Sequence, residues 1–110
     1  MIDWKRVGQL RDEIGPEDFA EVVEIFLEEV EEEIGALSSN PAPDTLEARL
    51  HFLKGSALNL GFESFSTLCK DGETAAAKGH AKQIDLTQIV TSYSQSKTEF
   101  ISALDTKFPG

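Results

Sequence analysis

Cysteine is almost absent from this chain, since Cys69 is the only one among 110 residues. A lone cysteine excludes an intramolecular disulfide and a metal site built from several cysteines. This usage is typical of a reducing compartment, so we expect a cytoplasmic protein. A lone cysteine on an apolar helical face is usually an inert small hydrophobic residue, and we expect this of Cys69.

Long hydrophobic runs and positive charge are also scarce. No apolar stretch approaches the roughly 20 residues that span a bilayer, and residues 1–6 lack the apolar segment of a signal peptide. The chain has 10 basic and 20 acidic residues, a net charge of -10, and 12 of the acids lie in the first 37 residues. We therefore expect neither nucleic acid nor a membrane as a partner.

Strand-like alternation is missing too, because the apolar residues recur at steps of three and four, as in amphipathic helices. The first expected helix lies between Asp3 as N-cap and Gly15, and the second runs from Pro16 to the stop at residues 38–43. The third covers Leu46 to Leu60 and ends at Gly61, and the fourth runs from Phe62 until Gly79. The fifth runs from Leu86 through Leu104, with Asp85 as N-cap. Short connections favour antiparallel neighbours. We predict an all-α fold, one domain over residues 1–110, in which an antiparallel up-down four-helix bundle carries a short additional N-terminal helix.

The richest motif is HFLKGSALNLG, which begins at His51. Lys54 and Gly55 follow one helical turn later on the same side as His51. The alternating leucine stripe, Leu50, Leu53, Ala57 and Leu60, is expected to enter the core and to leave these three residues facing outward. A neutral imidazole is a good acceptor for a phosphoryl group, and a nearby lysine can neutralise the charge on its oxygens.

Gly55 needs an explanation, since a glycine inside a helix costs about 1 kcal/mol relative to alanine. It either admits another backbone close to His51 or allows one helix to pack closely on another. Gly72 lowers the stability of the fourth expected helix in the same way. The second histidine, His80, is a weaker acceptor candidate because the stretch KGHAK reads as a loop without a supporting helical neighbour.

The motif resembles that of the histidine-containing phosphotransfer (HPt) domain family of multistep phosphorelays. That signature is a histidine, then lysine and glycine at the third and fourth positions after it, small residues next, and a second glycine ten residues after the histidine. The matching residues are His51, Lys54, Gly55, Ser56, Ala57 and Gly61.

The resemblance implies that His51 accepts a phosphoryl group from a receiver-domain aspartate and passes it to another receiver. It implies that Lys54 stabilises that group and that Gly55 admits the receiver. A polar residue on the following helix usually orients the histidine in this family, and Glu73 aligns there. The residues expected to meet the receiver are Phe52, Ser56, Leu58 and Gly61, whereas Ile2, Val7, Leu10 and Phe26 fit either that surface or the core.

The resemblance also implies which partners and cofactors to expect. The partners are response-regulator receiver domains and a hybrid sensor histidine kinase, and the receiver supplies the aspartate and Mg²⁺. The chain itself should be a monomer with no cofactor and no metal of its own. It has no glycine-rich nucleotide loop, so we expect a phosphorelay intermediate rather than an enzyme.

Three other interpretations of the sequence stay open. Glu47 and His51 stand at i,i+4 with Asp44 one turn earlier, which suits a metal-binding helical bundle, although Lys54 opposes a cation there. Alternatively, Glu47 faces solvent or orients the ring of His51. An acidic, non-catalytic interaction module would make His51 incidental. A hydrolase is the weakest reading, because neither Ser56 nor Cys69 has a histidine on its own helical face.

Overall fold

The computed structural model describes residues 2–39 and 43–107. Its elements are α1 (Trp4–Ile14), α2 (Pro16–Ser39), a 3₁₀ turn (Pro43–Thr45), α3 (Leu46–Leu60), α4 (Glu63–Ala77), a second 3₁₀ turn (Ala81–Gln83) and α5 (Leu86–Lys107). The described residues form no strand, only one isolated bridge between Ile2 and Phe62. The prediction of an all-α fold is confirmed. None of the described helices is long and apolar enough to cross a membrane.

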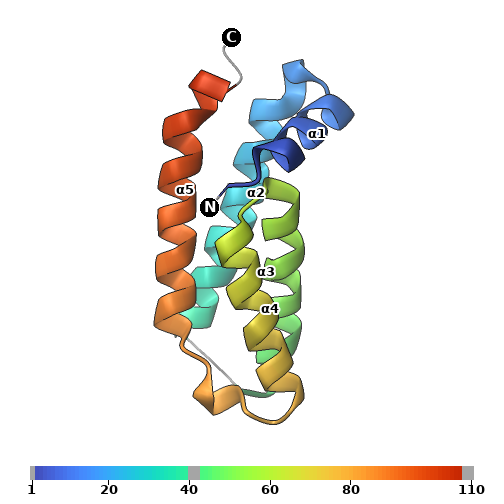
Figure 1. Ribbon diagram of the computed structural model, residues 1–110. Coiled ribbons are helices and arrows are strands. Elements are labelled where there is room, and N and C mark those ends of the chain that lie inside the picture. Colours follow the sequence, from blue (N-terminus) through green and yellow to red (C-terminus); the bar gives the residue numbers. More distant parts are fainter. Residues whose placement is uncertain (1, 40–42, 108–110) are drawn as a thin grey trace.

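The molecule is elongated, with extents of 46 × 21 × 20 Å. The helices α2 to α5 lie along the long dimension and the chain reverses between them, while α1 lies across the end where α2 begins (Figure 1). The most extensive packing joins α3 to α4, and α2 packs on α3 as α4 packs on α5. The helix that carries His51 is therefore held from two sides.

The helix ends follow from local capping. The Oδ1 of Asp3 accepts a hydrogen bond from the backbone N–H of Arg6 at 3.2 Å, so the expected N-cap is confirmed. The same contact forms at 3.0 Å between Asp85 and the N–H of Gln88 at the start of α5. The helix α2 ends at Ser39, inside the expected stop at residues 38–43, whereas α5 continues beyond expectation to Lys107. The extra turn of α5 places Lys107 over the ring of Trp4.

Gly61 joins the N-terminal segment to the turn between α3 and α4. Its φ of +74° is the left-handed conformation that caps α3, and its carbonyl accepts a hydrogen bond from the N–H of Asp3 at 2.7 Å. A Cβ at this position would lie 2.6 Å from the carbonyl oxygen of Asp3. Gly61 is buried, and the close backbone approach explains why the residue is glycine. Its contact with a partner stays a prediction.

Burial in the structure assigns the residues that the sequence placed either in the core or on the docking surface. Ile2, Val7 and Leu10 are buried, so they belong to the core, and Phe26 is half-buried against it. Gly72 is buried as well, and a Cβ there would lie 2.8 Å from Cδ1 of Leu50. The absent side chain thus lets α4 approach α3 closely, which accounts for a glycine within this helix.

Candidate functional site

His51 lies on α3 with 69% of its side chain exposed. Its Nδ1 is 2.8 Å from Oε2 of Glu73, which comes from the neighbouring helix α4. A carboxylate can only accept a hydrogen bond, so the proton of this bond must sit on Nδ1. In the neutral ring, the lone pair that can attack an electrophile is then on Nε2. The contact thus selects the tautomer as well as the orientation of the ring.

The second oxygen of Glu73 engages Lys54. Its Oε1 lies 2.8 Å from Nζ of Lys54, and both side chains are largely covered, at 19% exposed for Glu73 and 25% for Lys54. The hydrogen bond from Lys54, followed by the one from His51, lowers the pKa of Glu73 below its ordinary value, although burial opposes the shift. Glu73 is therefore ionised at neutral pH and bridges the two residues that the sequence placed on one face.

Buried apolar residues of α3 lie beneath these polar residues. Leu50, Leu53 and Ala57 are fully buried and Leu60 nearly so, as their spacing predicted. Gly72, next to Glu73 in the chain, brings α4 against Leu50. The distance between His51 and Glu73 is thus set by packing of the two helices rather than by loops.

Gly55 lies on the exposed side of α3, one turn after His51. A Cβ built on it would meet no other described atom within 4 Å. Close packing of one helix on another inside the chain therefore does not explain this glycine. The other explanation, the approach of another backbone from outside, stays a prediction.

The residues expected to meet the receiver differ in their exposure. Phe52 and Leu58 are 42% and 56% exposed, so both are accessible to a partner. Ser56 is only 7% exposed, so little of it is accessible to a partner, and its role in docking stays a prediction. It stands two turns after Arg49, whose Nε is 3.6 Å from Oε1 of Glu33, so Ser56 lies on the side of α3 that faces α2.

The alternative site residues gain no support from the geometry. Glu47 is exposed and makes no described hydrogen bond or ion pair with His51, so Glu73, not Glu47, contacts the ring. No three histidine, cysteine, aspartate or glutamate side chains gather in a metal-binding group within residues 2–39 and 43–107. His80 is exposed in the segment after α4, with no described partner for its ring.

The two candidate nucleophiles are both covered. Cys69 is fully buried, and burial raises the pKa of its thiol to about 12, so the reactive thiolate is scarce at neutral pH. Ser56 is buried and has no described histidine partner. A hydrolase built on either residue has no exposed nucleophile.

Sequence reasoning aligned Glu73 through the family pattern but missed its bond to Lys54. The spacing of a single helix cannot show this bond, because the partners are on α3 and α4. The one indication within the chain is that Glu73 directly follows Gly72, a buried glycine in a helix. This indicates a contact with Lys54 only when it is known that α4 packs on α3.

Comparison with known proteins agrees with this geometry. A family model described as Hpt domain matches residues 21–105, which include His51, Lys54, Gly55 and Glu73. Neither the curated proteins nor the solved structures gave a match. The matched residues cover most of the 110-residue chain, from α2 into α5. The chain belongs to the Hpt domain family.

Proposed function

We propose that this protein is a phosphorelay intermediate that accepts a phosphoryl group on Nε2 of His51 from a receiver-domain aspartate and passes it to another receiver. The observation that carries the proposal is the 2.8 Å contact between Nδ1 of His51 and the ionised Glu73, which leaves Nε2 as the available nucleophile on an exposed ring. Membership of the Hpt domain family supports the same chemistry.

The transfer step exchanges one bond at phosphorus for another. The Nε2 lone pair attacks the phosphorus of the aspartyl phosphate, the N–P bond forms, and the P–O bond to aspartate breaks with its electron pair returning to the carboxylate. The ring keeps its proton on Nδ1 and gains positive charge. The carboxylate of Glu73 lies against that proton and stabilises the charge. The reverse sequence delivers the group to the next receiver.

Lys54 and Gly55 act on the incoming group and on its carrier. Phosphoryl transfer depends mainly on positioning and on neutralising the charge of the equatorial oxygens. The Nζ of Lys54, held at 2.8 Å from Glu73, is close enough to His51 for its flexible stem to reach those oxygens. The open space at Gly55 admits the receiver, whose apolar surface meets Phe52 and Leu58.

We also propose the arrangement of the bundle, the partners and the location of the protein. The helix contacts fit an antiparallel up-down four-helix bundle with α1 across one end. The partners are receiver domains that bring their own Mg²⁺, with a hybrid sensor histidine kinase upstream. The protein acts in the cytoplasm as a monomer, without a nucleotide site or cofactor of its own.

The test is transfer of radiolabelled phosphate from a phosphorylated receiver in the presence of Mg²⁺. We expect acid-labile label on the wild-type protein and none on His51→Gln. The matched control His80→Gln should be labelled like the wild type, because His80 is exposed outside the site. Label retained in His51→Gln would exclude His51 as the acceptor and favour another role for this helical module.

A further inference from the structure

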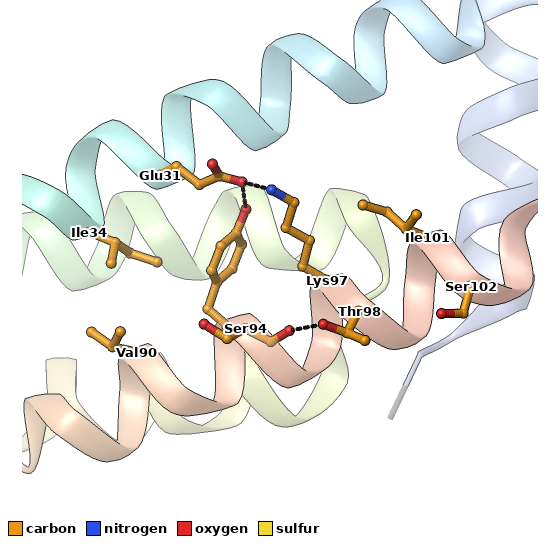
Figure 2. Close-up of a pocket in the computed structure, with 9 residues that line it drawn as sticks. Glu31, Ile34, Val90, Ser94, Lys97, Thr98, Ile101 and Ser102 are labelled. Carbon is orange, nitrogen blue, oxygen red and sulfur yellow. Dashed lines mark hydrogen bonds and ion pairs between the residues drawn. The ribbon is translucent and has the colours of Figure 1, made fainter.

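A groove separates α2 from α5. It has a volume of about 580 Å³. Glu31 reaches across it to Lys97, beside the hydrogen bond from the Tyr93 hydroxyl at 2.8 Å (Figure 2). The other described residues along it are Ile34, Val90, Ser94, Thr98, Ile101 and Ser102. Among the described residues, α3 packs on α2 and α4, and α4 packs on α5, whereas α2 and α5 pack little on each other.

One face of α5 borders this groove and packs little on α2. Val90, Ser94, Lys97 and Ile101 stand at i, i+4, i+7 and i+11, which places them in one row. Ile101 is 52% exposed, one of four large hydrophobic residues that the described structure leaves in solvent. A row of this kind, ending in an exposed isoleucine, is the surface that a partner helix covers.

Glu31 is the carboxylate that lines the groove, and the face of α2 that carries it is acidic. Glu24, Glu28 and Glu31 share a face of α2 at i, i+4 and i+7, and all three are exposed. Lys97 neutralises Glu31. Glu24 and Glu28 have no described basic partner, and α5 carries no lysine or arginine between Leu86 and Lys97 or between Lys97 and Lys107. This face of α2 therefore favours a basic occupant beside the groove.

The groove lies apart from His51. The ring of His51 and its partner Glu73 occupy the seam between α3 and α4. Since α2 packs on α3 and α5 packs on α4, the open seam between α2 and α5 is on the other side of the molecule. An occupant of the groove leaves the histidine accessible.

We propose that the groove between α2 and α5 binds a basic amphipathic helix of a partner protein, with its apolar side chains against Val90 and Ile101 and its lysines or arginines against Glu24 and Glu28. A helix fits because both walls are long helices whose side chains recur with the period of the occupant. A second copy of this chain fits poorly, since each copy carries a net charge of -10. This surface would stand even if His51 accepted no phosphoryl group.

The test uses a synthetic helical peptide of about 18 residues, with leucines at i, i+3, i+4 and i+7 and lysines flanking that stripe. Amide NMR of the full chain at about 0.15 M salt, where distant charges are screened, follows its binding. We expect shifts at Ser94, Thr98 and Ile101 and none at His51. A scrambled peptide of the same composition should bind roughly tenfold more weakly or worse, because it lacks the apolar stripe.

Variants separate the groove from general attraction to an acidic protein. Ile101→Glu and the double variant Glu24→Lys, Glu28→Lys should each weaken binding of the patterned peptide roughly tenfold. Thr67→Glu is the control, because Thr67 is exposed on α4, does not line the groove and gains the same charge. It should leave the affinity unchanged.

Several results would overturn the proposal. Equal binding of the patterned and scrambled peptides would show that net charge alone attracts the peptide. Shifts centred on His51, or unchanged affinity in Ile101→Glu, would place the peptide elsewhere. Sedimentation that shows a dimer dissociated by Ile101→Glu would make a second copy the occupant. Label transfer to His51 is followed in parallel, so failure of the phosphorelay is separable from failure of the groove.

Discussion

Glu73 connects the two polar residues of the candidate site, because one of its oxygens contacts His51 and the other contacts Lys54. The lysine thereby neutralises a carboxylate that would otherwise repel an incoming phosphoryl group. It also keeps that carboxylate ionised and able to accept the Nδ1 proton. The residues act as a unit, so we expect their effects on transfer to be non-additive.

The first prediction concerns the pH dependence of this unit. The folded pKa of Glu73 lies below its ordinary value of 4.5. Stability from its contacts is therefore fully present above that value and is lost as the pH falls through the lower, folded pKa. Carboxyl-carbon NMR should give a midpoint below 4.5 for Glu73, and Lys54→Ala should move it upward.

Lys5→Ala is the control for that titration, since Lys5 is an exposed lysine on α1 rather than on the helices that carry the site. It should leave the midpoint of Glu73 in place. A wild-type midpoint at or above the ordinary value, or no response to Lys54→Ala, would contradict the bridging geometry.

The second prediction concerns Gly55. Because a Cβ there meets nothing, Gly55→Ala should stabilise the protein by up to about 1 kcal/mol through helix propensity. Gly55→Gln should fold normally but slow transfer by roughly tenfold or more, since the long side chain obstructs the receiver near His51. Urea unfolding and the labelled-transfer rate measure the two effects.

Gly35 provides the matched control for Gly55, because it also lies within a helix and faces open space. Gly35→Gln should leave the transfer rate unchanged. Wild-type transfer by Gly55→Gln would remove the access argument and leave this glycine unexplained.

At the scale of the elements, the helices were predictable because their signals are local. Apolar spacing and the caps at Asp3 and Asp85 fix where helices begin. The two short 3₁₀ turns were missed, since three-residue turns carry no periodic pattern. A family pattern shows that a glycine is required at position 61, but it does not say whether a partner or the fold itself requires it.

The third prediction tests the role of Gly61 in the fold. Gly61→Ala forces a Cβ into the left-handed conformation at φ +74° and against the carbonyl oxygen of Asp3. We expect a loss of about 2 to 3 kcal/mol in the free energy of unfolding, from strain and overlap together. Urea unfolding measures the loss, and hydrogen exchange should show reduced protection of the Asp3 amide. Wild-type stability would contradict this close backbone approach.

At the scale of the whole molecule, the contacts that the sequence could not supply are those between helices. The single-helix pattern placed His51, Lys54 and Gly55 together, but the bond to Glu73 depends on how α4 lies against α3. The bridge from Glu31 to Tyr93 and Lys97 across the open groove depends in the same way on α2 and α5. Spacing along one helix contains no information about the distance to the next.

The fourth prediction uses Cys69 as a reporter of the whole core. It is fully buried, and burial raises the pKa of its thiol to about 12. Reaction with a thiol reagent should therefore wait for opening of the fold and run at least about 100-fold slower in the native protein than in urea. Rapid labelling of one thiol under native conditions would contradict the packing of α4 in the core.

The central claim is that Nε2 of His51 is the phosphoryl acceptor because Glu73 holds the proton on Nδ1. Heteronuclear NMR of the protein phosphorylated by a receiver tests it most directly, since phosphorus coupling to the ring identifies the bonded nitrogen. We expect a single phosphohistidine, at His51, bonded through Nε2. A phosphoryl group on Nδ1 of His51, on His80 or on a carboxylate would contradict the account.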